Sequence, residues 1–360
     1  MPVPETPEKK ARFWPEPVPN RLHVWPESFK VGRVGVLFVN LGTPDEPTAP
    51  AIRRYLREFL SDPRVIEIPK LLWWPILNGP ILTFRPRKLV HRYEGIWMDE
   101  GSPLLVYTKR QAAGVERLLQ TRGHDVAVAV AMRYGKPSIR QGLLDLRAQG
   151  CEHVLTLPLY PQYASSTTGT VVDEVTRVAS RLRNQPAMRF LKRFHIDESY
   201  IYPLADKIGA QWAERGKPQK LVMSFHGLPK RCVQLGDPYC RDSYETARAL
   251  AARLGLSDDD YLVTFQSRFG PAEWLQPYTE PTLQKLAQEG ITRVDVVCPG
   301  FVADCLETLE EISIECRDAF LEAGGQAFHY IACLNDDPSW VEGLTDMVER
   351  ELAGWPTKAR

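Results

Sequence analysis

Two series of short apolar runs, one in each half of the 360-residue chain, constrain the fold more than any other feature. Each run has the length and β-branched content of a buried strand, and segments with helical periodicity separate the runs. Strands that alternate with helices predict βαβ units and parallel sheets. We therefore expect an α/β protein of two similar Rossmann-like lobes, each with a parallel sheet flanked by helices. The predicted strands are 34–39, 126–132 and 154–159 in the first half, and 221–225, 261–266, 294–298 and 327–332 in the second.

The matching runs end alike. The first run of each half leads into x-Gly-x-Pro, at 41–44 and 226–229, and we expect a turn at both places. The second run of each half leads into Arg-aromatic-Gly, at 133–135 and 268–270. Because the carboxyl ends of parallel strands meet at one edge of a sheet, these segments should face a cleft between the lobes. The residues expected around this opening are His226, Ser267, Arg268 and Glu307.

Composition bounds the domains and the partners. We expect an irregular N-terminal extension (1–33), a first lobe (34–200) and a second lobe (201–360). The extension is rich in Pro and charge and has no signal-peptide core. Equal numbers of acidic and basic residues, 45 each, argue against a nucleic-acid partner. Seven cysteines without a repeating spacing indicate free thiols and the reducing cytoplasm.

A very apolar segment lies at 69–84 and includes adjacent tryptophans, Trp73 and Trp74. The stretch Leu71–Leu82 is too short to span a membrane and contains two prolines. Tryptophans favour membrane interfaces, so this apolar lip could make a peripheral contact with the inner face of the membrane. The alternative is a segment of the core, and the sequence leaves both interpretations open.

A row of acidic residues follows the third run of the second half. The run stops at a Pro-Gly pair, and a helix should begin near Asp304 as N-cap, with Glu307 in the capping-box position. Glu307, Glu311 and Glu315 then share one helix face, where like charges repel by about a few tenths of a kcal/mol per pair. A cation or a shared proton would offset that repulsion. A solvated acidic face is the alternative.

His226 directly follows a predicted strand, where its ring can face the cleft. Histidine is the side chain best suited to move protons near neutral pH, and it is the commonest metal ligand. A hydrogen-bonded packing histidine is the alternative. A His and a Glu without a thiolate partner suit a divalent ion such as ferrous iron. Two protein ligands suit a site that passes a metal on, and no zinc motif is present.

Aromatic residues cluster near the predicted strand ends and could be ordinary core. Together with Leu41 and the apolar lip, they could also line a pocket for a large flat apolar ligand. No Gly-x-Gly-x-x-Gly follows a strand and no Walker lysine loop is present, so a nucleotide ligand loses support. The aromatic residues are Tyr134, Tyr160, Tyr163, Phe269, Trp274 and Phe301.

These residues lie in motifs that resemble the ferrochelatase family. The resemblance runs from about residue 34 to the C-terminus, and the stretch 298–311, Cys-Pro-Gly-Phe-Val-Ala-Asp-Cys-Leu-Glu-Thr-Leu-Glu-Glu, is the most specific block. It implies a porphyrin in the cleft between the lobes and insertion of ferrous iron into protoporphyrin IX, with release of two protons, in the last step of haem synthesis. The other matching blocks are 39–44, 101–103, 133–134, 160–169, 224–229, 236–239 and 266–275.

The resemblance also implies roles for residues. His226 and Glu307 would act on opposite sides of the porphyrin plane, as catalytic residues and as metal ligands. Glu311 and Glu315 would carry protons out or metal in. Arg85, Lys88 and Ser267 fall near positions that hold porphyrin propionates in related proteins. The full set of porphyrin-binding residues that we expect is Leu41, Arg85, Lys88, Tyr93, Arg133, Tyr134, Ser267, Trp274 and Phe301.

Departures from the family pattern sharpen the expectations. Cys305 stands where animal members carry histidine. We expect no iron–sulfur cluster, which needs four ligands, and no permanently bound cofactor, with Fe²⁺ as a substrate only. Two rivals stay open: a chelatase for cobalt or for coproporphyrin, and a non-catalytic porphyrin or haem carrier. The oligomeric state is not readable from the sequence.

Overall fold

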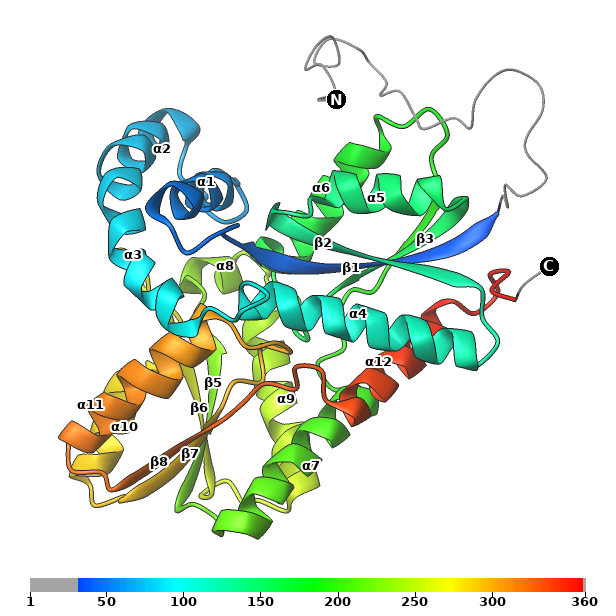
Figure 1. The fold of residues 1–360 in the computed structure, drawn as a ribbon. Coiled ribbons are helices and arrows are strands. Elements are labelled where there is room, and N and C mark those ends of the chain that lie inside the picture. The colour runs from blue at the N-terminus through cyan, green and yellow to red at the C-terminus, as the bar shows by residue number, and fades with distance from the viewer. Residues whose placement is uncertain (1–31, 359–360) are drawn as a thin grey trace, which may run out of the picture.

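The computed structural model describes residues 32–358, which form two four-stranded sheets with helices on their faces (Figure 1). The predicted irregular extension, 1–33, lies almost entirely outside these residues. The strand orders are β2-β1-β3-β4 and β6-β5-β7-β8, and every strand pair is parallel. In both sheets the second strand lies outside the first, so the two lobes share one topology. The repeated runs of the sequence predict this duplication, and the fold class is confirmed.

The first lobe contains the apolar lip as a helical excursion between β1 and α4. Its helices and strands are β1 (Arg33–Thr43), α1 (Ala49–Leu60), α2 (Lys70–Ile76), η1 (Leu77–Ile81), α3 (Leu82–Ile96), α4 (Pro103–Thr121), β2 (Val126–Gly135), α5 (Ile139–Ala148), β3 (Cys151–Pro158), η2 (Ser165–Gly169), α6 (Thr170–Ala179) and β4 (Ala187–Phe190).

The second lobe repeats the strand–helix alternation. Its helices and strands are α7 (Glu198–Arg215), β5 (Lys220–His226), α8 (Lys230–Gln234), α9 (Tyr239–Leu254), β6 (Tyr261–Gln266), α10 (Thr279–Gln288), β7 (Arg293–Val297), η3 (Glu307–Cys316), α11 (Arg317–Glu322), β8 (Ala327–Ile331) and α12 (Pro338–Glu351).

The turn expected directly after the first run is wrong in position, because β1 continues to Thr43. Asn40 pairs with Met132 and Gly42 pairs with Tyr134, so β2 carries the pairing past the predicted stop. Gly42 makes this possible. Its φ is +122°, and a Cβ there would lie 1.8 Å from the Tyr134 carbonyl oxygen, so only glycine fits.

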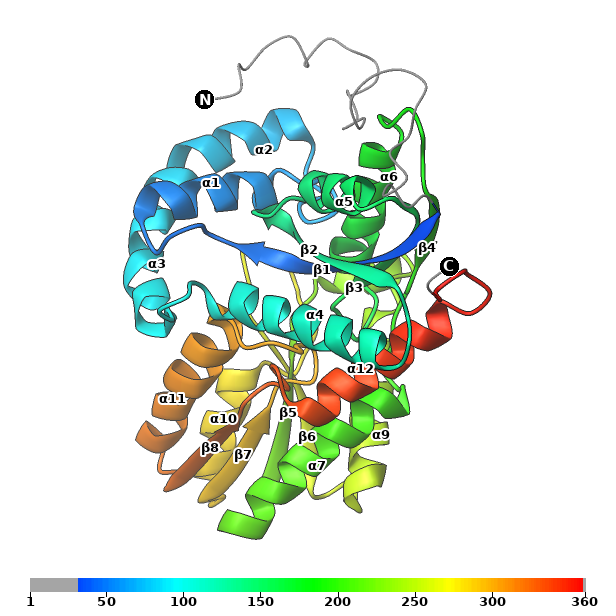
Figure 2. The same cartoon turned by 45° about the vertical axis from the view of Figure 1, so that its right-hand side comes forward.

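The last helix joins the lobes. α12 lies between α4 of the first lobe and α7, and both views show the three helices packed together (Figures 1 and 2). One continuous apolar core includes Phe38 of β1, Phe225 of β5 and Trp340 of α12, all fully buried. The C-terminal helix therefore seals the junction between the two sheets, and the expected boundary at residue 200 falls inside α7.

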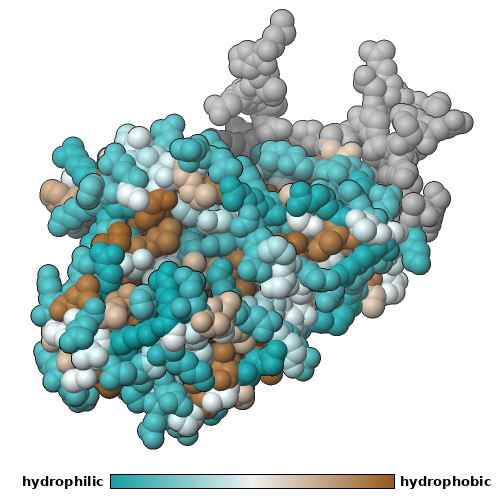
Figure 3. All heavy atoms as spheres, turned by 60° about the horizontal axis from the view of Figure 1, so that its bottom comes forward, coloured by the Kyte–Doolittle hydropathy of each residue, from teal (hydrophilic) through white to brown (hydrophobic). Residues whose placement is uncertain are grey.

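Part of the apolar lip is buried, as a core segment would be, and part is exposed, as a membrane contact requires. Trp73 is buried, and its indole nitrogen donates to the Leu60 carbonyl at 2.7 Å. Leu71 is 91% exposed and Trp74 is 67% exposed. None of the helices formed by residues 32–358 is long and apolar enough to cross a membrane. On the face shown in Figure 3, apolar side chains gather in separate patches among hydrophilic ones.

Candidate functional site

His226 is the last residue of β5 and is half-buried. Its Nδ1 lies 2.7 Å from the Gly227 carbonyl oxygen. A carbonyl only accepts hydrogen bonds, so Nδ1 carries the proton in the neutral ring and Nε2 keeps its lone pair. Nε2 is therefore the atom that can take a proton or bind a metal.

Gln266 connects His226 to the acidic helix. It ends β6, lies opposite His226 in the sheet register and is 4% exposed. Its side-chain nitrogen donates to the Glu307 carbonyl oxygen at 2.7 Å and reaches Glu311 Oε2 at 3.5 Å. Its oxygen accepts from Ser224 at 2.8 Å. One buried amide thus fixes the distance between the end of β6 and the first turn of η3.

Glu311 is held by Ser267, the residue after Gln266. The Ser267 backbone N–H donates to Glu311 Oε1 at 2.6 Å, and the Ser267 hydroxyl donates to Oε2. Ser267 has a φ of +63°, which is a strained backbone conformation for a serine. Burial raises the pKa of Glu311 above its ordinary value, against the opposing influence of Ser267 and His226. The carboxyl group therefore holds a proton more readily than an exposed glutamate.

The start of the acidic helix differs from the capping box that the sequence predicts. The Asp304 carboxylate does not cap the helix backbone: it accepts from the Tyr330 hydroxyl at 2.5 Å and the Asn335 amide at 2.6 Å. Thr308 takes the capping position instead, because its hydroxyl accepts from the Cys305 N–H at 3.0 Å. Asp304 is buried, so these closer donors compete successfully for its oxygens.

η3 is a π-helix over Glu307–Cys316, a wide form that is rare and frequent at functional sites. Its acidic residues do not form a solvated face, since Glu307, Glu311 and Glu315 are all only partly exposed. Arg92 of α3 supplies the cation that like charges at this spacing require. Its guanidinium lies 3.3 Å from Glu315 Oε2 and 3.8 Å from Glu310 Oε1.

Residues of the lip helices face η3 from the first lobe. The Arg85 guanidinium lies over the Phe269 ring at 4.6 Å from the ring centroid. Burial lowers the pKa of Arg85, while nearby Tyr55, Glu307 and Tyr93 oppose the shift. Burial raises the pKa of Tyr93 far above its ordinary value, and Glu307 adds to this. Arg85, Tyr93 and Glu307 are thus brought together.

The remaining predicted residues have different surroundings. Leu41 packs with both the lip cluster and the residues at the start of η3. The Phe301 ring stands beside the His226 ring, with centroids 6.4 Å apart and planes at 55°. Trp274 is half-buried beside Gly227, where an added Cβ would lie 2.9 Å from its ring. Lys88 is exposed on α3.

Arg133 and Tyr134 bind a buried carboxylate. Arg133 donates to Asp62 at 2.5 Å and to the Thr170 carbonyl at 2.9 Å. The Tyr134 hydroxyl donates to the same Asp62 oxygen at 3.0 Å, and Tyr134 is fully buried. Both residues line a hollow of about 480 Å³ whose wall also includes Glu58. The polar atoms of Arg133 and Tyr134 are therefore already hydrogen-bonded to other residues of the first lobe.

Sequence reasoning missed Gln266, Arg92 and Asp62. Gln266 and Asp62 are polar residues whose burial follows from tertiary packing, which periodicity does not report. The signal for Gln266 was its place as the last residue of a predicted strand, directly before Ser267. Arg92 had a weaker signal, since the repulsion within the acidic row requires a cation from some other segment.

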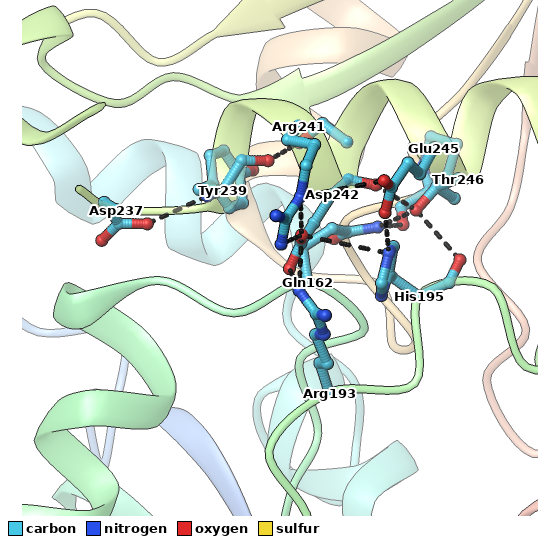
Figure 4. Close-up of polar contacts among 11 residues, drawn as sticks. Gln162, Arg193, His195, Asp237, Tyr239, Arg241, Asp242, Glu245 and Thr246 are labelled. Atoms are coloured by element: carbon cyan, nitrogen blue, oxygen red, sulfur yellow. Dashed lines mark hydrogen bonds and ion pairs between the residues drawn. The ribbon is translucent and has the colours of Figure 1, made fainter. Parts of the chain in front are cut away.

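A second polar cluster lies on α9 (Figure 4). Within residues 32–358, His195, Asp242 and Glu245 are the one group of three possible metal ligands whose ligand atoms converge. Glu245 already binds His195 Nε2 at 2.8 Å, and the buried Asp242 accepts from Arg193 at 2.7 Å and from Arg241 at 3.1 Å. Two guanidinium groups balance the two carboxylates, so this cluster is a set of ion pairs and we assign no metal to it.

The fold is similar to that of solved chelatases. The structure described as "SirB from Bacillus subtilis with Fe3+" is 16% identical with a TM-score of 0.53, and the likeness covers 89% of this chain and 96% of that chain. The sirohydrochlorin chelatase SirB from Bacillus subtilis subspecies spizizenii, in complex with cobalt, is 14% identical with a TM-score of 0.50, over 89% and 95% of the two chains. At such identities the likeness concerns the fold alone, and the class is a two-lobed chelatase-like α/β protein.

Sequence relatives define the family. The ferrochelatase family model matches residues 33–352. The ferrochelatase of Bordetella pertussis (strain Tohama I) is 65% identical over 347 residues, 96% of each chain. That of Aromatoleum aromaticum is 54% identical over 96% of this chain and 93% of its own. The chain belongs to the ferrochelatase family and is a metal chelatase that inserts iron into a porphyrin for haem synthesis, as its motifs predict.

Proposed function

We propose that this chelatase inserts ferrous iron into protoporphyrin IX at the opening where β5 and β6 end, with His226 and Glu307 nearest to the reacting atoms. The observation that supports this most directly is the arrangement around Gln266. This residue lies opposite His226 in the sheet and binds both the first turn of η3 and the Glu311 carboxylate. One flat ligand at this half-buried place could therefore contact a base, His226, and two acidic residues, Glu307 and Glu311.

The two pyrrole protons leave through His226 and Glu311. The porphyrin nitrogens lose these protons as the metal enters, and the lone pair on His226 Nε2 accepts them one at a time. Glu311 lies within electrostatic reach of His226, so its carboxylate stabilises the imidazolium that forms. Its raised pKa also suits it to receive the proton next. Glu315, farther along η3, leads from there toward the surface.

Ferrous iron meets His226 and Glu307 before it enters the ring, and once the ion has left His226 Nε2 the lone pair of that atom is free to accept the pyrrole protons. A neutral imidazole and a carboxylate suit this ion without holding it permanently. The outer acidic groups, Glu310 and Glu315, are paired with Arg92. Metal that approaches along η3 therefore has to displace the Arg92 guanidinium first.

The porphyrin lies between the lip helices and the ends of β5 and β6. Leu41, Tyr93, Trp274 and Phe301 form the apolar walls, and Arg85 and Lys88 face the propionates beside Ser267, whose two donors stay on Glu311. Arg133 and Tyr134 support the wall from behind. Contacts with the walls offset the strain of a bent macrocycle, which exposes the nitrogen lone pairs to the metal. In domain terms, residues 34–200 and 201–360 provide one side of the cleft each.

The decisive experiment compares two histidine variants in an anaerobic assay with ferrous iron and protoporphyrin IX. We expect His226→Ala to lose iron insertion by a factor of about 10² to 10⁴, the usual contribution of a positioned proton acceptor. Porphyrin binding, followed by fluorescence, should persist. His91→Ala, an exposed histidine on α3, is the matched control and should keep full activity. Full turnover by the His226 variant would contradict the assignment.

Substrate preference separates protoporphyrin from its rivals. The exposed lip residues favour an apolar vinyl-bearing porphyrin over the more acidic coproporphyrin. Parallel assays with protoporphyrin and coproporphyrin, each with ferrous iron and with cobalt, should give the highest kcat/KM for iron and protoporphyrin. A carrier would bind porphyrin without turnover, and the row of titratable groups on η3 favours the enzyme instead. Higher kcat/KM with coproporphyrin would overturn this choice.

We also propose that the lip touches the membrane surface. Its exposed apolar side chains exceed what scattered surface positions provide. We expect co-sedimentation with phospholipid vesicles that Leu71→Ser with Trp74→Ser abolishes. Unchanged sedimentation of that double variant would reduce the lip to a pocket wall. The exposed apolar members of the lip are Leu71, Leu72, Trp74, Ile76 and Phe84, and Ile68 is exposed directly before it.

The absence of an iron–sulfur cluster stays a prediction. Its test is the ultraviolet–visible spectrum of the purified, haem-free protein, where thiolate–iron absorption would contradict it.

A further inference from the structure

The loop between β7 and η3 is fixed at its second residue, Pro299, by two buried side chains. The Pro299 carbonyl accepts from the Gln162 amide at 3.0 Å and from the Tyr200 hydroxyl at 2.8 Å. Gln162 follows β3 of the first lobe and is 2% exposed. Its second amide hydrogen goes to Thr246 of α9 at 2.8 Å, in the cluster that Figure 4 shows. Both lone pairs of this carbonyl are therefore occupied.

The same arrangement recurs three residues later. The Val302 carbonyl accepts from the Gln111 amide at 3.0 Å and from the Asn335 N–H at 2.9 Å. Gln111 comes from α4 of the first lobe and is fully buried. Its second amide hydrogen goes to the Asn335 carbonyl at 2.7 Å. Gln111 Oε1 has no partner among the described residues, so the fold retains this side chain despite an unsatisfied buried oxygen.

The two held carbonyls flank the residue that faces His226. Between them lie Gly300 and Phe301, and the Phe301 ring stands beside the imidazole. The loop then continues into the first turn of η3, which carries Glu307. Two glutamines of the first lobe thus set the position of a wall that belongs to the second lobe.

We propose that Gln111 and Gln162 are positioning residues for iron insertion, which act from the first lobe by holding Phe301 against His226 and the macrocycle. This inference rests on the proposed function, because it gives Phe301 a place in the porphyrin site. A purely structural role would also explain the hydrogen bonds, since a buried irregular backbone needs partners. The two roles differ in one respect: only positioning makes the reaction rate depend on these amides through Phe301.

The first test replaces each glutamine by methionine, which is similar in size and cannot donate. Each carbonyl keeps its second donor, so the variants should fold. We expect Gln111→Met and Gln162→Met to lower kcat about tenfold each, because small displacements of positioning groups are costly to rate. The KM for ferrous iron should stay unchanged. Gln141→Met, on the exposed face of α5, is the matched control and should behave as wild type.

The second test asks whether the effect passes through Phe301. In a Phe301→Leu background, Gln111→Met should lower kcat by less than about twofold, because residues that act as a unit are not additive. An unchanged kcat in both methionine variants, or a full tenfold loss in the Phe301→Leu background, would overturn the proposal. If a methionine variant fails to fold, Tyr200→Phe removes one donor from the Pro299 carbonyl and keeps the ring. It should also lower kcat, and wild-type kcat there would count against positioning.

The outcomes separate the two proposals. If wild type inserts iron and His226→Ala does not, while the glutamine variants keep full kcat, only the positioning role falls. If wild type inserts no iron, the proposed function and the positioning role fall together.

Discussion

The two lobes have the same strand order, but the polar residues at their strand ends are used differently. In the first lobe, Arg133 and Tyr134 at the end of β2 both bind the buried Asp62, and their charges and hydrogen bonds are satisfied there. In the second lobe, the equivalent edge carries His226 and the Ser267–Glu311 pair, which remain half-buried. One copy of the edge thus binds the segment that follows α1, whereas we propose that the other copy takes part in proton transfer. The comparison predicts that variants at the first edge change stability with little effect on rate, whereas variants at the second edge also change rate.

The largest expected effect is on stability at the first edge. Asp62→Ala leaves the Arg133 guanidinium, which is only 13% exposed, without its carboxylate. Breaking such a buried pair should lower the free energy of unfolding by about 3–5 kcal/mol. Denaturant unfolding followed by circular dichroism measures this. The kcat per folded molecule should stay near wild type. A clear fall in this kcat would contradict the comparison.

At the second edge, Glu311→Gln should act on rate. The amide cannot receive a proton from His226, and we expect kcat to fall about 100-fold, which corresponds to about 2.7 kcal/mol in the activation free energy. Initial rates of iron insertion give the answer. Glu322→Gln, on α11 beyond the acidic row, is the control. Wild-type kcat in the Glu311 variant would remove this residue from the proton path.

Two variants of Ser267 distinguish the contribution of its hydrogen bond to stability from that of its strained backbone. Ser267→Ala removes the hydroxyl bond to Glu311 and keeps the positive φ, so it should lower stability by about 1.5 kcal/mol. Ser267→Gly removes the same bond but relieves the strained backbone, which should recover about 1 kcal/mol. Chemical denaturation of both variants tests the order. If the glycine variant is the less stable one, the strain at this residue has been misjudged.

The smallest expected effect is a pH slope. Because burial raises the pKa of Glu311 in the folded state, the folded protein binds a proton that the unfolded chain has already released. The stabilising contribution is complete below the ordinary glutamate pKa of about 4.5 and is lost as pH rises through the folded value. The stability of Glu311→Gln relative to wild type should therefore increase from pH 4 to pH 7. A difference that is constant over this range would contradict the raised pKa.

Much of the fold is predictable because strand ends and their register follow from local patterns. The runs at 261–266 and 327–332 predict β6 and β8 closely, and the repeated endings predict the shared topology. β4 was not predicted, because its segment Ala187–Phe190 is short and no residue in it is buried. The full length of β1 was not predicted either, because only the pairing with β2 shows that the strand continues past Gly42.

The candidate site could be proposed from sequence where its chemistry is visible in a residue type and its position. His226 and Glu311 could be proposed from strand ends and acidic spacing. The π-helical form of η3 could not, because a wide turn and an ordinary turn place residues four apart on similar faces. Asp304 fits a capping box in sequence, yet Tyr330 and Asn335, which come later in the chain, bind its carboxylate.

The C-terminal helix has a consequence for synthesis of the chain on the ribosome. α12 packs against α4, which was translated more than two hundred residues earlier, and Val341 of α12 lies directly over Gly114 of α4. Until α12 leaves the exit tunnel, the side of α4 that α12 contacts stays open, although α4 already packs on the first sheet. A nascent polypeptide arrested before Pro338 should consequently recruit chaperones.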